Sequence, residues 1–151
     1  MEILYKKGDI CFCSENYILH GCNAQGKMAS GVAKALRLKY PQATWDVYNK
    51  KFNTSGLNVG DIIIGTQNNK TIFNCITQKY YGYDGKLYFD YDTFKNICIQ
   101  IDSMTAIDNI PFTQIAMPKI GAGLAGGDWK TISNIIETNF KLKQPVVYEI
   151  D

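Results

Sequence analysis

Short apolar runs alternate with longer amphipathic segments along the chain of 151 residues. Residues 3–5 and 17–22 are rich in β-branched and aromatic side chains and are bounded by polar residues, which predicts two strands. Residues 31–40 repeat apolar side chains at every fourth position, as an amphipathic helix does. Pro41 ends that helix and opens another, which Gly56 stops. The chain therefore begins with two strands and two helices.

The middle of the chain predicts a hairpin followed by a long helix. Residues 61–66 and 71–77 are apolar and rich in β-branched side chains, and the polar residues 67–70 lie between them as a turn. Residues 94–104 place their apolar side chains on one face of a helix.

The last third predicts a strand at residues 114–117, a glycine-rich loop at 118–127, a helix from 129 to 140 and a final strand at 145–150. Strands that alternate with helices favour a mixed central sheet covered on both faces. The fold class is therefore α/β, with three α/β/α layers in a single domain that spans residues 1–151.

Composition narrows the class of protein. Hydrophobic residues make up 46% and charged residues 20%, and the formal net charge of +2 is too balanced for a nucleic-acid track or a polybasic membrane surface. No apolar stretch is long enough for a membrane span, so we expect a cytoplasmic protein. We also expect a monomer, because the sheet uses up the predicted apolar faces of the helices. Five cysteines without a framework spacing and a single histidine favour reduced thiols, with no metal and no cofactor.

The strongest local signal lies in the loop before the last helix. Residues 120–129 read Ile-Gly-Ala-Gly-Leu-Ala-Gly-Gly-Asp-Trp. Closely spaced glycines let the backbone approach a ligand, so that N–H groups converge on an anion near the positive end of a helix. A diphosphate is the anion that we expect there. The alternative is a tight connection that needs glycine only for packing.

Three polar side chains near the loops are candidates for chemistry. Asp128 begins the last helix, where it either caps the helix or orients a water or a sugar hydroxyl. His20 ends a strand and is either a structural group or an acid or base near neutral pH. Asn23 opens the following loop and either holds a sugar diol or simply makes a turn.

Three motifs, in this order, resemble the macrodomain family. Residues 7–10 read Lys-Gly-Asp-Ile, residues 20–23 read His-Gly-Cys-Asn with Gly-Val-Ala at 31–33, and residues 117–124 read Met-Pro-Lys-Ile-Gly-Ala-Gly-Leu. The resemblance covers almost the whole chain. It implies an α/β/α macrodomain that binds ADP-ribose in a cleft at the strand ends.

The resemblance also implies which residues contact the ligand. Asp9 would accept a hydrogen bond from the adenine amino group, Ile10 would pack on the ring, and Tyr148 would lie near the adenine pocket. Asn23 would hold the distal ribose. The remaining contacts to the diphosphate and the distal ribose would come from two loops, through Ser30, Gly31, Val32, Pro118, Ile120, Gly121, Ala122, Gly123, Leu124, Ala125, Gly126 and Gly127.

Within the family the chain is similar to two branches, the terminal ADP-ribose glycohydrolases and the ADP-ribose 1″-phosphate phosphatases. The glycohydrolase branch has a lysine directly after an Ile-Thr pair and an aspartate after Gly-x-Gly-Leu. Here Gln78 and Ala125 stand at those places, and glutamine cannot form a Schiff base. The motif at residues 20–23 and the helix that ends at Tyr40-Pro41 are similar to the phosphatase branch, and residues 81–86 and 123–129 are similar to small phage-encoded members of that branch.

The resemblance therefore predicts an enzyme that hydrolyses ADP-ribose 1″-phosphate to ADP-ribose and phosphate. His20, Asn23 and Asp128 are its candidate catalytic residues. Two alternatives stay open: a reader that binds ADP-ribose or an ADP-ribosylated protein without turnover, and a hydrolase that removes ADP-ribose from modified protein or nucleic acid. The tyrosines of residues 80–91 either form aromatic walls over the distal ribose or only pack.

Overall fold

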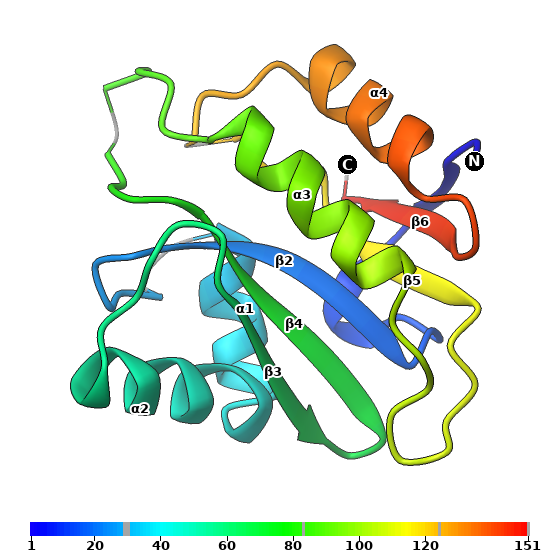
Figure 1. The fold of residues 1–151 in the computed structure, drawn as a ribbon, viewed down its shortest axis with the longest axis horizontal. Helices are drawn as coiled ribbons and strands as arrows, with labels where there is room; N and C mark the ends of the chain where they lie inside the picture. The colour runs from blue at the N-terminus through cyan, green and yellow to red at the C-terminus, as the bar shows by residue number, and fades with distance from the viewer. Residues whose placement is uncertain (29–30, 83, 124, 151) are drawn as a thin grey trace.

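Six strands form one sheet in the computed structural model, which describes residues 1–28, 31–82, 84–123 and 125–150 (Figure 1). The strand order is β1-β6-β5-β2-β4-β3. The first five strands in that order pair in parallel, and β3 pairs antiparallel with β4, so the predicted mixed sheet is confirmed. The strands are β1 (Leu4–Lys7), β2 (Tyr17–Asn23), β3 (Ile62–Gln67), β4 (Lys70–Gln78), β5 (Gln114–Met117) and β6 (Gln144–Glu149).

Helices cover both faces of the sheet, which confirms the three predicted layers. On one face α3 and α4 lie side by side (Figure 1) and bury residues such as Phe94 and Ile132 against the sheet. On the other face Leu36 of α1 and Tyr48 of α2 are fully buried. The helices are the 3₁₀ helix η1 (Ile10–Phe12), α1 (Gly31–Lys39), the π-helix η2 (Gln42–Asp46), α2 (Val47–Thr54), α3 (Tyr91–Asp102) and α4 (Trp129–Asn139).

The predicted hairpin is confirmed, and its turn explains its register. Asn68 and Asn69 have φ angles of 52° and 62°. Two consecutive residues with positive φ make the type I′ turn whose twist matches that of paired strands, and asparagine tolerates this conformation. Gln67 therefore pairs directly with Lys70.

The segment after Pro41 differs from the single helix that the sequence predicts. It forms the π-helix η2 and then α2. The backbone of η2 lies directly against β3, because a Cβ added to Gly65 would collide with the carbonyl oxygen of Ala43 and lie 2.6 Å from its Cα. Close approach of this kind requires glycine at position 65.

All five cysteines are buried free thiols. Among the described residues no cluster of three or more potential metal ligands occurs. In the same part of the chain, no helix has the length and apolar character that crossing a bilayer requires.

Candidate functional site

Five parallel strands end at the same edge of the sheet. These strand ends are Lys7, Asn23, Gln78, Met117 and Glu149. The carboxyl edge of a parallel sheet is where ligands bind in open α/β folds, since the loops leaving the strands meet there. The sequence motifs singled out above therefore come together on one edge.

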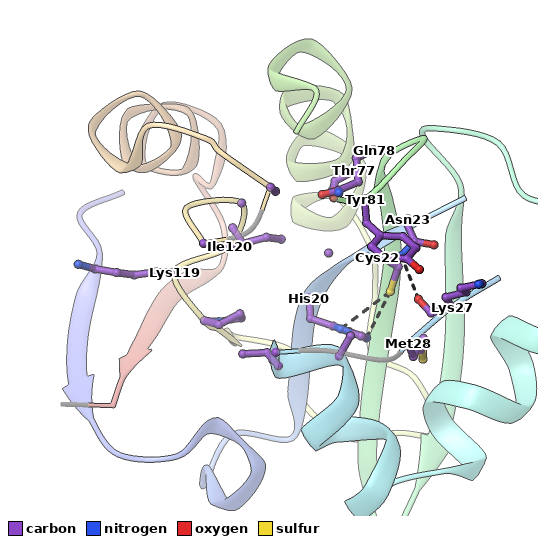
Figure 2. A pocket seen from close by; sticks show the side chains of 18 residues that line it. His20, Cys22, Asn23, Lys27, Met28, Thr77, Gln78, Tyr81, Lys119 and Ile120 are labelled. Atoms are coloured by element: carbon purple, nitrogen blue, oxygen red, sulfur yellow. Dashed lines mark hydrogen bonds between the residues drawn. The ribbon is translucent and has the colours of Figure 1, made fainter. Parts of the chain in front are cut away.

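A cavity of about 350 Å³ opens at the ends of β2, β4 and β5. Figure 2 shows His20, Cys22 and Asn23 of β2 near Thr77, Gln78 and Tyr81, with Ile120 across the cavity from them. Its lining residues are His20, Gly21, Cys22, Asn23, Lys27, Met28, Gly31, Val32, Ala33, Thr77, Gln78, Tyr81, Pro118, Lys119, Ile120, Gly121, Gly123 and Ala125.

His20 lies on the inner wall of this cavity and is 1% exposed. Its Nε2 is 2.6 Å from Oδ1 of Asn74, whose amide donates to the carbonyl oxygens of Ala43 and Ile63. Because the Asn74 amide nitrogen is a donor in both bonds, Oδ1 accepts, and Nε2 of His20 carries the proton. Burial lowers the pKa of His20 to about 4, although the bond to Asn74 opposes this shift. The ring is therefore neutral at pH 7.

The thiol of Cys22 lies beside the His20 ring, at similar distances from both ring nitrogens. Sγ of Cys22 lies 3.9 Å from Nδ1 and 3.8 Å from Nε2. Burial raises the pKa of Cys22, so the thiol keeps its proton. His20 is thus a neutral imidazole fixed between protein groups at the cavity wall, and its catalytic role stays a prediction.

The side chain of Asn23 bonds to the backbone of the loop that follows it. Its Oδ1 accepts from the N–H of Gln25 at 3.0 Å, and its amide donates to the carbonyl oxygen of Lys27 at 2.9 Å. The buried Tyr48 hydroxyl accepts from the N–H of Lys27 and donates to the carbonyl oxygen of Asn23. One amide hydrogen of Asn23 is left for a ligand, whereas its oxygen already accepts protein bonds.

The glycine-rich loop contributes to the cavity lining residues whose backbone N–H groups are unpaired within the described part of the chain. The N–H of Gly127 bonds to Gly121 and that of Gly126 to Gly123, which fold the loop on itself. The N–H groups of Gly121, Gly123 and Ala125 have no hydrogen-bond partner within the described part of the chain, and all three residues line the cavity. Successive backbone N–H groups in a turn can form an anion-binding concavity, so this loop is a candidate for one.

The first residues of α1 line the same cavity. They are Gly31, Val32 and Ala33. The first N–H groups of an α-helix have no partner within the helix, and the helix dipole makes this end positive. The cavity therefore has anion-binding groups from two elements.

Asp128 has the capping role that was one of its two predicted roles, and its catalytic role stays a prediction. Its carboxylate accepts from the N–H and the hydroxyl of Thr131 at 3.1 and 2.8 Å, which makes it the N-cap of α4. These bonds lower the pKa of Asp128. Its own N–H donates to the Tyr91 hydroxyl. Asp128 is not among the residues that line the cavity.

The other residues predicted to contact the ligand divide into three groups. The cavity lining includes Asn23, Gly31, Val32, Pro118, Ile120, Gly121, Gly123 and Ala125. The structure does not bring Asp9, Ile10, Ala122, Gly126, Gly127 or Tyr148 into this lining, and the predicted roles of Ser30 and Leu124 lie outside the described residues.

The predicted adenine residues, which lie near β1, are nevertheless connected through a buried cluster to a residue that lines the cavity. Asp9 is the N-cap of η1 and accepts from the N–H of Cys11 at 2.9 Å through Oδ1. Ile10 belongs to a buried apolar cluster against which Val32 and Tyr148 pack. Val32 also lines the cavity. This side chain therefore connects the cavity with the cluster that contains Ile10, one of the predicted adenine contacts.

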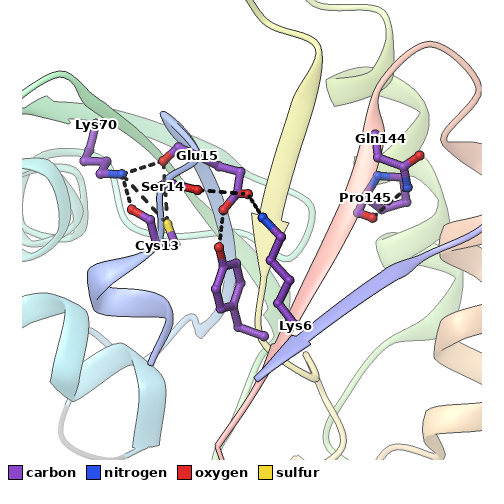
Figure 3. Close-up of polar contacts among 8 residues, drawn as sticks. Lys6, Cys13, Ser14, Glu15, Lys70, Gln144 and Pro145 are labelled. Carbon is purple, nitrogen blue, oxygen red and sulfur yellow. Dashed lines mark hydrogen bonds and ion pairs between the residues drawn. The ribbon is translucent and has the colours of Figure 1, made fainter. Parts of the chain in front are cut away.

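The buried carboxylate of Glu15 connects β1 and β6 on this side of the sheet (Figure 3). Glu15 is 5% exposed, and its two oxygens accept from the Tyr148 hydroxyl at 2.5 Å and from the Lys6 ammonium at 2.9 Å. Burial raises the pKa of Glu15, but the bonds from Tyr148 and Lys6 outweigh it and hold the pKa below its usual value. Lys70 donates to the carbonyl oxygens of Cys13 and Glu15. The segment that carries η1 is thereby tied to β4 and β6.

Sequence reasoning missed several lining residues. Lys27, Met28 and Thr77 line the cavity without having been predicted as ligand contacts, whereas Tyr81 belongs to residues 80–91, whose tyrosines were predicted either to form walls over the distal ribose or only to pack. Thr77 is fully buried, and its hydroxyl has no partner among the described residues. The sequence holds one signal for Thr77, which is its position near the end of a predicted strand. In the structure this strand is β4, the parallel neighbour of β2.

The charged residues of the described lining are Lys27 and Lys119. The ammonium of Lys119 pairs with Glu149 at 3.0 Å, and in Figure 2 it points away from the other labelled side chains. The lining described above contains no carboxylate. Its polar groups are therefore mostly amides, hydroxyls and backbone N–H groups.

Comparison with known proteins gives relatives across the whole chain. No family model matches. An uncharacterized 17.5 kDa protein of Enterobacteria phage T4 is 31% identical, over 91% of this chain and 90% of that protein. The DNA ADP-ribosyl glycohydrolase of Mycobacterium tuberculosis is 24% identical over 92% of this chain, which spans 39% of that protein. ADP-ribose glycohydrolase OARD1 of Bos taurus is 24% identical, over 93% of this chain and 85% of that protein.

Solved structures share the fold. A Bacteroides thetaiotaomicron protein of unknown function has a TM-score of 0.82 and 28% identity, with 98% of each chain covered. The macrodomain of M. tuberculosis DarG has a TM-score of 0.79 and 22% identity, over 97% of this chain and 96% of that one. The structure of Thermosipho africanus DarTG in complex with ADP-ribose has a TM-score of 0.76 and 15% identity, over 98% of this chain and 42% of that one. With this fold and these relatives, the chain belongs to the macrodomain family.

Proposed function

We propose that this protein binds ADP-ribose along the carboxyl edge of its sheet and hydrolyses the bond to the group at C1″ of the distal ribose. One observation carries the proposal: Gly121, Gly123 and Ala125, whose N–H groups have no partner within the described residues, line one cavity together with the N-terminal residues of α1. A diphosphate has the negative charge and the spread of oxygens to accept from both sets.

The strand order supports the orientation of the ligand. With the diphosphate at the loop after β5, the distal ribose lies toward Asn23 of β2 and the adenosine toward Asp9 beyond β1. From β2 to β1 there are three strand spacings, or about 14 Å, which an extended dinucleotide-sized ligand spans. Asp9 uses Oδ1 for the N–H of Cys11, which leaves its other oxygen for the adenine amino group.

The distal ribose meets amide and imidazole groups. Asn23 has one amide hydrogen left to donate to a ribose hydroxyl. His20 supplies a neutral ring of fixed tautomer at the same wall. Both therefore position the sugar without adding charge next to the reacting bond.

The proposed hydrolysis depends on charge stabilisation by the backbone. The lining supplies no carboxylate as a general base, and Gln78 offers no amine for a Schiff base. Preorganised N–H groups can stabilise the negative charge that develops when water attacks. The names of the mycobacterial and bovine relatives, both ADP-ribosyl or ADP-ribose glycohydrolases, support a hydrolase.

ADP-ribose 1″-phosphate is the substrate that we propose first. Water attacks phosphorus, the bond between phosphorus and the C1″ oxygen breaks, and ADP-ribose and inorganic phosphate leave. A lining free of carboxylates favours this substrate because it does not repel a phosphate dianion. The second candidate is a glycosidic bond to a nucleobase or a protein side chain, which the names of the relatives favour.

The test supplies both substrates in water enriched in oxygen-18. Release of labelled phosphate from ADP-ribose 1″-phosphate over many turnovers is the expected result. Release of ADP-ribose from a modified oligonucleotide or protein, with no phosphate release, would replace the first candidate with the second. Binding of ADP-ribose without either reaction would make the protein a reader.

A further inference from the structure

Positive charge is concentrated in one part of the chain. Residues 16–45 and 62–83 hold six of the 16 lysines and arginines and none of the 14 aspartates and glutamates. These two ranges contain β2, β3, β4 and α1. The balanced formal charge of +2 therefore conceals a basic region next to the cavity and an excess of acidic residues elsewhere.

Three exposed lysines of this region surround the end of the cavity at β2 and β4. Lys27 lines the cavity, and in Figure 2 its side chain extends outward, away from His20. The carbonyl oxygen of Lys79 accepts from the N–H of Ala24 at 3.2 Å, which puts Lys79 beside the loop that carries Lys27. Lys34 directly follows the three residues of α1 that line the cavity.

The protein does not neutralise these three lysines. Within the described part of the chain, neither Lys27 nor Lys34 nor Lys79 forms an ion pair with a carboxylate. Lys70 of the same region is different, because its ammonium is committed to the carbonyl oxygens of Cys13 and Glu15. Unpaired surface charge of one sign attracts ligands of the opposite sign. The three lysines therefore favour an anion outside the cavity.

Exposed aromatic rings lie on the same loops and on α2. Tyr80 is 53% exposed, and the Lys79 ammonium lies 5.3 Å from the centre of its ring. Phe52 is 39% exposed and lies against Gly26, where an added Cβ would be 2.8 Å from the ring. Unpaired bases stack on such rings, and cations beside the rings bind the phosphates between the bases. Lysines next to exposed rings fit single-stranded nucleic acid better than an acidic protein.

The position of this surface fits the orientation of the ligand. The inference rests on the proposed function, which puts the diphosphate at the loop after β5 and the distal ribose at Asn23 of β2. The diphosphate is attached at C5″, and C1″ lies on the opposite side of the ribose ring. A group at C1″ therefore leaves the cavity on the side of β4, where the lysines lie. A base that enters the cavity has to be outside a duplex stack.

We propose that Lys27, Lys34 and Lys79, together with Tyr80 and Phe52, form a binding surface for single-stranded nucleic acid. The phosphates of the strand accept from the lysines, its bases stack on the exposed rings, and a base modified with ADP-ribose enters the cavity. The surface extends the second candidate of the proposed function, since ADP-ribose 1″-phosphate needs the cavity alone.

The test uses an unmodified, fluorescently labelled single-stranded oligonucleotide of about twelve nucleotides, so that it does not depend on ADP-ribose. Fluorescence anisotropy measures its affinity at several salt concentrations. The double variant Lys34→Gln/Lys79→Gln is compared with Lys95→Gln/Lys130→Gln, which changes the net charge equally at exposed positions of α3 and α4. Both double variants should keep the wild-type melting temperature, because the lysines are exposed.

We expect Lys34→Gln/Lys79→Gln to lower the affinity about tenfold or more at low salt. The slope of log K against log salt should decrease by about 1.4, because each lost phosphate contact to a single strand removes about 0.7. The control variant should keep the wild-type slope. Tyr80→Leu should lower the affinity about fivefold or more, the range expected for one stacked base, and leave the slope unchanged.

Equal losses in the two double variants, or no binding by the wild type, would overturn the proposed surface. Binding of a poly-glutamate peptide of equal charge as tightly as the oligonucleotide would overturn the choice of nucleic acid. A wild type that binds ADP-ribose but not the oligonucleotide keeps the proposed function and loses this inference. A wild type that binds the oligonucleotide but not ADP-ribose would overturn the proposed function and the entry of a modified base into the cavity.

Discussion

His20 and Asn74 form a hydrogen bond of 2.6 Å between neighbouring strands, and both side chains are buried. The Asn74 amide is committed to the carbonyl oxygens of Ala43 and Ile63. Asn74 can therefore accept only through Oδ1, and this sets the tautomer of His20. A histidine predicted at the mouth of a polar loop is in fact part of the inner sheet surface, beside the cavity.

The first prediction concerns the dependence of stability on pH. His20 has a pKa of about 4 in the folded chain and an ordinary value of 6.5, so the unfolded chain binds the proton more readily between these values. Stability due to His20 is complete above about pH 6.5 and is lost as the pH falls toward 4, by up to about 3 kcal/mol. Urea unfolding at pH 7.5, 6 and 5 measures this loss.

The variant His20→Gln supplies the control for that series. Glutamine does not titrate, so the decrease between pH 7.5 and 5 should be smaller by most of the amount assigned to His20. Equal slopes in the wild type and in His20→Gln would show that the imidazole is not buried as described.

The second prediction is that Tyr48 positions the loop after β2. Tyr48→Phe removes the hydroxyl that bonds to Asn23 and Lys27, so the free energy of unfolding should fall by about 1 kcal/mol. ADP-ribose affinity should fall several-fold, since this loop lines the cavity. Chemical unfolding and calorimetric titration check the two effects. A fall in stability at unchanged affinity would argue against the positioning role.

The third prediction separates capping from catalysis at Asp128. Asp90 caps α3 through Thr93 in the same way as Asp128 caps α4 through Thr131. Asp128→Ala and Asp90→Ala should each lower the melting temperature, and neither should change turnover after correction for the folded fraction. Loss of turnover in Asp128→Ala alone would restore Asp128 as a catalytic candidate.

The fourth prediction concerns the glycine-rich loop. Gly126 and Gly85 have φ angles of 75° and 76°, but only at Gly126 would an added Cβ collide, with the carbonyl oxygen of Lys86. Both alanine variants carry the same backbone strain, and Gly126→Ala also separates the loop from residues 86–87. ADP-ribose affinity should fall about tenfold or more in Gly126→Ala and stay near the wild-type value in Gly85→Ala. Calorimetric titration of the two variants measures the difference.

Much of the fold follows from local pattern. The strand Gln114–Met117 and the hairpin around Asn68 and Asn69 were predicted, because short apolar runs and turn chemistry act within a few positions. The capping role of Asp128 was one of two stated alternatives for the same reason. The pairing of β1 with β6 was not predicted, since it joins the two ends of the chain.

The site was less accessible to sequence reasoning. Burial of His20 depends on the π-helix η2 and on β3, which supply the carbonyl oxygens for Asn74. The contributions of Thr77 and Tyr81 to the cavity depend on β4 lying next to β2. Glycine-rich motifs reveal where a backbone must approach a ligand, whereas the side chains that surround the ligand are set by strand order.

Calorimetric titration of the wild-type protein with ADP-ribose tests the central claim most directly. The account predicts saturable binding of one ADP-ribose per chain, with no comparable binding of ribose 5-phosphate, which lacks both the diphosphate and the adenosine. Absence of saturable binding at millimolar ADP-ribose would contradict the assignment of this cavity to the ligand.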